Sequence, residues 1–288
     1  MRARVSVSET TEPVADYRHL EVRPLNPTLG AEVGGVDLGD LDDERFAEIE
    51  RAFARHSVLV FRDQSLGAEQ QLAFGRRFGP LHVHPAAPSL PDHPEVMIIH
   101  ADSRSKFVAG EGWHTDVSCD ERPPMATILR LETVPPSGGD TLFASMYAAY
   151  ESLSEPMRAF LGGLSALHSS DHVYAGRYGV RSEESRDGKF PSAVHPVIRT
   201  HPVTGRKALF VNPAFTTKIL GLSGEESASL LAFLYRVQQK PEFQCRVIWK
   251  RDTLTIWDNR CTHHCAIWDY YPHVRHGYRV SVVGERPE

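Results

Sequence analysis

The chain has 288 residues, of which 41% are hydrophobic and 24% are charged, so it can bury a sizeable core and is not disordered overall. Its 32 basic and 37 acidic residues give a net charge of −5 without a run of like charges, which argues against nucleic acid or a membrane surface as a partner. With no apolar leader, no stretch approaching the roughly 20 apolar residues of a membrane span, and only four cysteines, we expect a cytoplasmic protein without a disulfide scaffold.

The hydrophobic pattern then predicts short helices and many strands. Asp40 or Asp42 is suited to cap a helix that runs to about Arg55, and residues 58–61 indicate a buried strand. Residues 67–78 have the spacing of a second helix. Further strand-like runs lie at residues 96–100, 126–131, 141–143, 193–200, 207–211, 243–249, 253–257 and 278–283, with a broken helical pair at 145–161.

The arrangement of these elements favours one β-rich domain. Residues 223–239 form a helix with a capping-box start, and no βαβ alternation is present. We therefore predict a mainly β (α+β) fold with a double-stranded β-helix, or jelly-roll, core and flanking helices. Residues 1–16 are expected to be a mobile tail, and the domain spans 17–288 with a lid insertion around 170–192.

Fifteen histidines motivate a search for a metal site. His114 and Asp116 lie two residues apart, so in an extended segment their side chains point to the same side. A second histidine-rich run contains His263 and His264. Two histidines and one carboxylate on one face of a metal leave adjacent positions open, as in non-heme Fe(II) oxygenases. On these residues alone, a surface histidine beside a solvated aspartate is the competing interpretation.

Two arginines follow the second histidine run. In a strand, Arg275, Gly277 and Arg279 face the same way. Two guanidinium groups that enter one site could each hold an anion through two hydrogen bonds. An exposed basic edge strand is the competing interpretation of this pattern.

Four segments, together with these arginines, carry a family resemblance. They are FGPLHVHP (78–85), WHTDV (113–117), PPMATILRLETVPPSGGDTLFASMYAAYESLS (123–154) and WDNRCTHHCAIWDY (257–270). The sequence thereby resembles, from about Leu20 to Glu285, the taurine dioxygenase family of Fe(II)- and 2-oxoglutarate-dependent oxygenases. This family includes alkylsulfatases and aryloxyalkanoate dioxygenases. The resemblance implies an enzyme that uses Fe(II), with 2-oxoglutarate and O₂ as cosubstrates, and it implies a homodimer or homotetramer.

The resemblance also implies roles for individual residues. The iron ligands would be His114, Asp116 and His264. Thr141 and Arg275 match the family positions that hold the distal carboxylate of 2-oxoglutarate. Arg279 matches the position that contacts the proximal carboxylate and the substrate anion. His84 and the backbone of Val117 match positions that contact the substrate. The expected reaction is oxidation of an unactivated C–H bond in a small anionic organic substrate, by hydroxylation, desaturation or ring oxidation.

Two places depart from the taurine enzyme and bear on the substrate. Ala86 and Ala87 follow the His84-Pro85 pair where that enzyme has a tyrosine, and Ala-Gly-Glu-Gly (109–112) replaces a segment with a polar amide. Small residues there favour a bulky, largely apolar carboxylic acid, such as a natural-product or terpenoid acid. The alternative is a dioxygenase that cleaves a sulfonate, an alkyl sulfate or an aryloxyalkanoate.

Other classes of protein are weighed against this one. A jelly-roll protein could bind a metal and an anion without turnover, and a zinc hydrolase could use a metal-bound water. A structural zinc site at Cys261, His263, His264 and Cys265 is disfavoured because these residues crowd into one short segment. His263 is expected to face away from His264, and His82, His93 and His100 are expected to be surface or core histidines.

Overall fold

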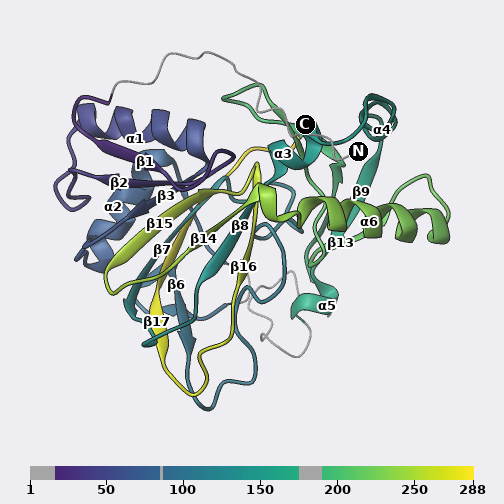
Figure 1. The fold of residues 1–288 in the computed structure, drawn as a ribbon. Coiled ribbons are helices and arrows are strands. Elements are labelled where there is room, and N and C mark those ends of the chain that lie inside the picture. The colour runs from purple at the N-terminus through teal and green to yellow at the C-terminus, as the bar shows by residue number, and fades with distance from the viewer. Residues whose placement is uncertain (1–16, 85–86, 175–189) are drawn as a thin grey trace.

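The computed structural model describes residues 17–84, 87–174 and 190–288 (Figure 1). The expected tail at 1–16 and residues 175–189 of the expected lid lie outside the described residues. Among the described residues, no helix is both long and apolar enough to cross a membrane.

The N-terminal region places two helices against one end of a large sheet. Asp42 caps the first helix by accepting a hydrogen bond from the Arg45 backbone N–H, as predicted, and the helix ends before Ser57 in a left-handed conformation. Its apolar face, with Phe46, Ile49 and Phe53, is buried. The elements of this region are β1 (Glu21–Pro24), β2 (Ala31–Gly34), α1 (Asp43–His56), β3 (Val58–Phe61) and α2 (Ala68–Phe78).

The large sheet has nine strands, in the order β1-β2-β3-β15-β7-β17-β6-β5, with β4 paired to β17. Its central strands are far apart in sequence, since β15 pairs with β7 and β7 pairs with β17. The remaining strands of this sheet are β4 (Leu81–His82), β5 (Ser89–Leu90), β6 (His93–Ala101), β7 (Ala126–Thr133), β15 (Thr253–Asp258) and β17 (Arg275–Val282).

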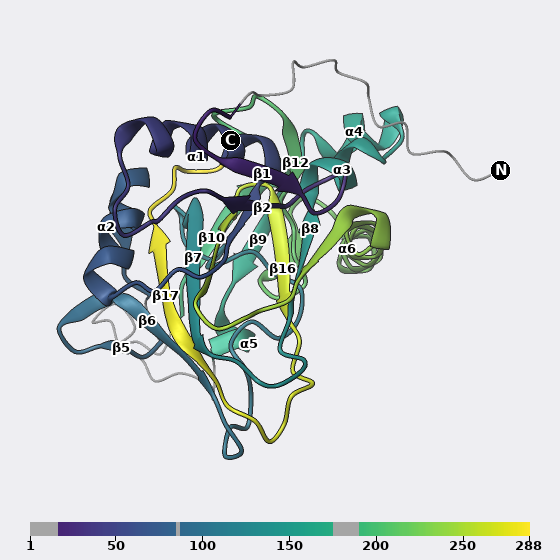
Figure 2. The same cartoon turned by 60° about the vertical axis from the view of Figure 1, so that its left-hand side comes forward.

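A smaller three-stranded sheet lies beside the large one (Figures 1 and 2). Its order is β14 (Gln244–Val247), β8 (Thr141–Ser145) and β16 (Thr262–Ala266). One buried cluster joins Leu131 of the large sheet to Phe143 and Val247 of the small one. Each such fully buried side chain contributes roughly 1.5–3 kcal/mol, so this layer holds the two sheets together. The coarse prediction of a mainly β fold with flanking helices is confirmed.

The rest of the described chain forms a helical and short-strand region beside the sheets. Ser223 and Glu226 make the predicted capping box at the start of the long helix α6. The run predicted as one strand at 193–200 is two strands, interrupted at Val197. The elements are α3 (Met146–Glu151), α4 (Glu155–Leu161), β9 (Ser165–Ser169), α5 (Asp171–Tyr174), β10 (Ser192–Pro196), β11 (Ile198–Thr200), β12 (Lys207–Leu209), β13 (Thr216–Ile219), α6 (Gly224–Gln238) and η2 (Pro241–Phe243).

Candidate metal and anion site

A single backbone bridge brings the two histidine-rich segments together. His114 lies in the loop before β7, and His264 lies on β16. The His114 backbone N–H donates to the His264 carbonyl at 3.0 Å, and the His264 N–H donates to the His114 carbonyl at 2.7 Å. The two residues are thus directly opposite each other, so their side chains leave the backbone on the same side.

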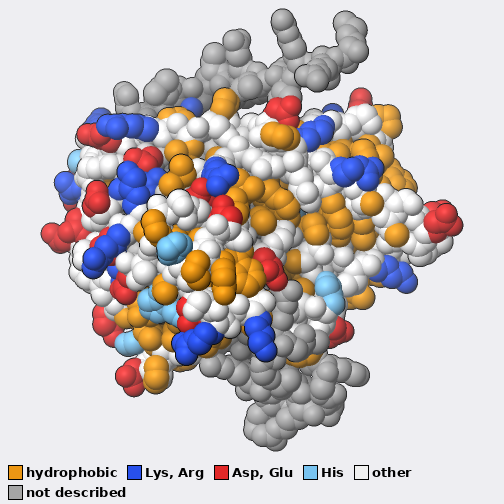
Figure 3. Space-filling view, turned by 60° about the horizontal axis from the view of Figure 1, so that its bottom comes forward, with side chains coloured by type: hydrophobic (Ala, Val, Ile, Leu, Met, Phe, Trp, Pro, Cys, Tyr) orange, Lys and Arg blue, Asp and Glu red, His pale blue; other side chains and the backbone are white. Residues whose placement is uncertain are grey.

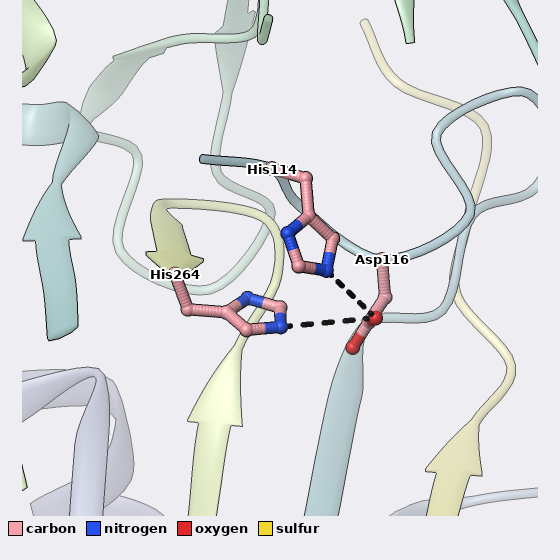
Figure 4. A group of neighbouring side chains, drawn as sticks. All are labelled: His114, Asp116 and His264. Atoms are coloured by element: carbon pink, nitrogen blue, oxygen red, sulfur yellow. Dashed lines mark ion pairs between the residues drawn. The ribbon is translucent and has the colours of Figure 1, made fainter. Parts of the chain in front are cut away.

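The side chains of His114, Asp116 and His264 converge in this buried position (Figure 4). Asp116 Oδ1 lies 3.7 Å from His114 Nε2 and 3.8 Å from His264 Nε2. All three possible donor atoms lie within 4.8 Å of one another. One atom of each residue therefore faces a common point, as three ligands on one face of a metal ion must.

The tautomers and charges of the three residues suit a metal. His114 Nδ1 lies 3.0 Å from the Gly112 carbonyl, which can only accept, so Nδ1 carries the proton and Nε2 is left with a lone pair. Burial, with the charge of His114 as a lesser cause, holds the pKa of His264 well below its usual range, so this imidazole is neutral. Burial alone would raise the pKa of Asp116, but Arg279 and both histidines hold it well below its usual range. The donor set is two imidazoles and one carboxylate.

Asp116 is held in place by Arg279, which the sequence analysis singled out, and by Thr127 and Asn259, which it did not. Thr127, on β7, donates from Oγ1 to Asp116 Oδ2 at 2.7 Å. Asn259 donates from Nδ2 to Thr127 Oγ1 at 2.9 Å and accepts from Trp257 Nε1 at 3.0 Å. Arg279 Nη1 donates to Asp116 Oδ1 at 2.9 Å. Both carboxylate oxygens are thereby oriented, which is what a ligating carboxylate needs.

This chain's residues fit a divalent iron ion. Nitrogen and carboxylate donors of intermediate softness, grouped on one side, are the set that non-heme Fe(II) sites use. His264 Nδ1 is buried and has no hydrogen-bond partner among the described residues, but its Nε2 faces Asp116. The expected alternative with Cys261, His263 and Cys265 is not supported, because these residues do not join His264 in any cluster of possible ligands among the described part of the chain.

Arg275 and Thr141 both contact Trp249. Arg275 is 3% exposed, and its Nε donates to the Gly139 carbonyl at 3.1 Å. Thr141 Oγ1 accepts from Trp249 Nε1 at 3.0 Å, and the guanidinium carbon of Arg275 lies 5.5 Å from the centre of the Trp249 ring. Sequence reasoning missed Trp249, which no local motif marks.

Asp140 acts on the charge of Arg275 from beyond ion-pair distance. Among the described residues no carboxylate forms an ion pair with Arg275. Burial lowers the pKa of Arg275 to about 10, which still leaves it charged at neutral pH. A buried cation that makes no direct ion pair costs stability, so this group is suited to receive an anionic ligand.

The remaining predicted residues line a pocket next to the metal cluster. The residues that line it are His84, Met97, Val108, Ala109, Gly110, Glu111, His114, Asp116, Val117, Val173, Tyr174, Ala214, Phe215 and Arg279. Val117 has a φ of 46°, which is strained for a β-branched residue. His84 Nδ1 accepts from the Ala87 backbone N–H at 2.9 Å. The wall is largely apolar, and Arg279 is a cation beside the metal cluster.

Comparisons with known proteins identify the family of this chain. The model of the taurine catabolism dioxygenase TauD, TfdA family matches residues 21–281. The chain is 36% identical to an alpha-ketoglutarate-dependent sulfonate dioxygenase of Saccharomyces cerevisiae, over 93% of this chain and 68% of that protein. It is 35% identical to an alpha-ketoglutarate-dependent sulfate ester dioxygenase of Pseudomonas putida, over 93% of this chain and 91% of that protein. The crystal structure of a taurine dioxygenase from Burkholderia xenovorans superposes with a TM-score of 0.81 at 37% identity, covering 93% of this chain and 92% of that one.

Proposed function

Because this chain belongs to the taurine catabolism dioxygenase TauD, TfdA family and is an Fe(II)- and 2-oxoglutarate-dependent dioxygenase, we propose that it cleaves a small organic sulfonate, sulfate ester or aryloxyalkanoate. The reacting carbon would be the one bonded to the sulfur or ether oxygen. The observation that carries this proposal is Arg279, a buried cation beside the metal cluster in a largely apolar pocket. It could hold an anionic head group while apolar side chains hold the remainder.

The relatives favour this substrate class over the natural-product or terpenoid acid that the small residues at 86–87 and 109–112 suggested. Ala109 and Gly110 do line the pocket. Small wall residues also leave space for an alkyl chain or an aromatic ring, so they do not by themselves select a terpenoid acid.

We propose that His114, Asp116 and His264 bind the iron. When bound, iron and 2-oxoglutarate supply the oxidising power for C–H oxidation, and 2-oxoglutarate becomes succinate and CO₂. The protein keeps the His264 imidazole neutral by burial and keeps Asp116 ionised through Arg279. Thr127 holds the second oxygen of Asp116, so that the other one faces the two histidines.

Arg275 and Thr141 would hold the distal carboxylate of 2-oxoglutarate. The indole N–H can only donate, so Trp249 occupies a lone pair of the Thr141 hydroxyl and leaves its proton available for an anion. Arg275 would supply the opposing charge through its free guanidinium edge. Arg279 would contact the proximal carboxylate and the substrate anion, and His84 and the backbone of Val117 would contact the substrate.

The substrate's position would decide the product. With R–CH₂–O–SO₃⁻, insertion of one oxygen atom at the carbon gives R–CH(OH)–O–SO₃⁻, which collapses to R–CHO and HSO₄⁻. The second oxygen atom of O₂ enters succinate. A sulfonate would release sulfite in the same way, and an aryloxyalkanoate would release a phenol. Apolar walls exclude water from this step.

For the fold and assembly we propose a jelly-roll core made by the large and small sheets. The strands of each sheet come from distant parts of the chain and share one buried layer, which supports this assignment. A homodimer or homotetramer remains a proposal from the family resemblance, and the lid around 170–192, most of which lies outside the described residues, remains a proposal from the sequence.

The test is a substrate screen with the Fe(II)-loaded enzyme. Alkyl sulfates, alkanesulfonates, aryloxyalkanoic acids and apolar carboxylic acids would be compared for stimulated succinate release, and the anion or phenol released would be quantified. We expect release stoichiometric with succinate for one of the first three classes. Stimulation by the apolar carboxylic acids alone, with a hydroxylated product, would reject the proposal.

A further inference from the structure

Two histidines face each other on the surface of the large sheet, away from the metal cluster described above. His100, on β6, and His276, on β17, are direct register partners. Their Nδ1 atoms lie 3.3 Å apart, and the His100 side chain is 46% exposed. Figure 3 shows histidine side chains grouped on one side of this face. Because side chains alternate along a strand, His276 points away from the face that carries Arg275.

The separation of the two nitrogens matches a metal chelate. Zinc binds imidazole nitrogen at about 2.0–2.1 Å with tetrahedral angles, so two such ligands lie about 3.3–3.4 Å apart. Exposed rings on neighbouring strands can rotate slightly about χ2 and turn both lone pairs to one point. The pair therefore has the spacing of two ligands on one ion.

The opposite nitrogens of the two rings face oxygen atoms. His100 Nε2 lies 3.7 Å from Asp102 Oδ2, and His276 Nε2 lies 3.4 Å from the Tyr278 hydroxyl. Histidines that bind metals usually donate their other N–H to a carboxylate or another oxygen, which fixes the tautomer. Hydrogen bonds from the backbone and side chain of Arg104 lower the pKa of Asp102 to about 2, so it remains ionised. This carboxylate favours the His100 tautomer in which Nδ1 is free.

Without a metal, one hydrogen bond explains the same contact. His276 Nδ1–H would donate to His100 Nδ1, and the Tyr278 hydroxyl would donate to His276 Nε2. Binding a metal needs a tautomer change in His276 alone, after which its Nε2–H donates to the Tyr278 oxygen. A hydroxyl can do either, so the surroundings accommodate both states.

We propose that His100 and His276 form a surface site for a divalent transition-metal cation, Zn²⁺ or Cu²⁺, bound through the two Nδ1 atoms and completed by water. The Irving–Williams order places Cu²⁺ above Zn²⁺ at such a site. A bound ion would join β6 to β17, the strand that also carries Arg275 and Arg279. The site needs no catalytic residue, so it stands independently of the proposed substrate.

The experiment is calorimetric titration of the full-length chain with Zn²⁺, with the catalytic cluster disabled by His264→Ala. One equivalent should remain bound, and the further change His276→Asn should weaken it at least tenfold. Asp102→Asn should weaken it about tenfold, as loss of an orienting carboxylate does. His93→Asn is the matched control, since His93 is also on β6 but contacts Glu69 instead.

A second measurement avoids the double variant. In the otherwise unmodified chain, His100→Asn should lower the zinc stoichiometry by one while circular dichroism stays unchanged. Cu²⁺ added to the His264→Ala chain should show nitrogen hyperfine coupling that His276→Asn removes. Unchanged binding in both histidine variants, or an equal loss in His93→Asn, would overturn the proposal.

Discussion

Two buried clusters among the described residues contain possible metal ligands, but only one of them has histidine lone pairs that the protein leaves unused. The first is His114, Asp116 and His264, and the second is His201, Asp258 and Cys261. In both, the possible donor atoms lie within 4.8 Å of one another. A count of histidines, carboxylates and cysteines would therefore treat them as equals.

The second cluster is satisfied by the protein itself. Arg260 donates from Nε to Asp258 Oδ1 at 2.8 Å and from Nη2 to Oδ2 at 2.7 Å. His201 Nδ1 accepts from the Val203 and Thr204 N–H groups, so its Nε2 carries the proton that it donates to Asp258 at 2.9 Å. Burial raises the pKa of the Cys261 thiol to about 12, so it stays protonated.

The difference shows that the hydrogen bonds of the candidate ligand atoms distinguish a metal site from a cluster that stabilises the fold. In the first cluster, both histidine Nε2 atoms face a carboxylate at distances too long for hydrogen bonds. In the second cluster every corresponding lone pair is already used. Substitutions should therefore remove metal binding in one cluster and folding stability in the other.

The largest effect is expected for His264→Ala. This change should abolish iron binding and succinate formation, because two ligands do not complete the metal face. His263→Gln is the matched control, since His263 is buried beside it but lies outside the cluster; it should lower stability and keep one iron per chain. Succinate formation unchanged in His264→Ala would disprove the ligand assignment.

Asp258→Asn tests the other half of the comparison. It should lower the free energy of unfolding by ~3–5 kcal/mol, because Arg260 is left buried with an incomplete partner. Urea unfolding of the iron-free protein measures this, and metal analysis should still find one iron per folded chain. Loss of iron from a chain of unchanged stability would mean that the two clusters have exchanged roles.

Arg275→Ala should weaken 2-oxoglutarate binding by ~2–5 kcal/mol, because one partner of a buried charged contact is removed. This corresponds to a KM for 2-oxoglutarate raised ~30-fold or more. Arg279→Ala should instead weaken substrate binding more than 2-oxoglutarate binding. The reverse pattern in steady-state kinetics would show that the two arginines are assigned the wrong way round.

The sequence predicted those parts of the fold that local chemistry determines. Asp42 and Ser223 cap their helices because their side chains accept backbone N–H groups a few residues away. The short strands β9 and β13 were missed, since polar and charged residues interrupt their apolar pattern. Their pairing depends on strands far along the chain, and a local sequence pattern does not identify those strands.

The site shows the same division. His114 and Asp116 could be paired from their spacing, but their meeting with His264 could be expected only through the family resemblance. Trp249 and Thr127 were missed because each acts by one hydrogen bond to a residue more than ten positions away. The arrangement of such contacts follows from the packing of the two sheets, which a single sequence does not specify.

Lowering the pH should separate the contribution of the buried histidines to the free energy of unfolding from that of Asp258. Burial lowers the pKa values of both His168 and His263 to about 3, so the unfolded chain takes up protons below about 6.5 when the native chain does not. Stability is therefore fully present above pH 6.5 and falls towards pH 3, by ~2 kcal/mol per histidine at pH 5. The low pKa of Asp258 keeps its contribution intact over this range. Urea unfolding of iron-free protein at pH 7 and pH 5 measures the loss, and equal stability at both would contradict it.

The smallest effect is expected at Trp249, which contacts both Thr141 and Arg275 but is not expected to touch the metal. Trp249→Phe keeps an aromatic ring under Arg275 and removes the N–H that orients the Thr141 hydroxyl. Losing this one hydrogen bond should raise the KM for 2-oxoglutarate ~2–10-fold, with kcat and the substrate KM unchanged. Trp249→Leu removes the ring as well and should raise the same KM further. A change confined to the substrate KM would place Trp249 at the substrate instead, whereas a purely structural role would lower stability without this selective change in KM.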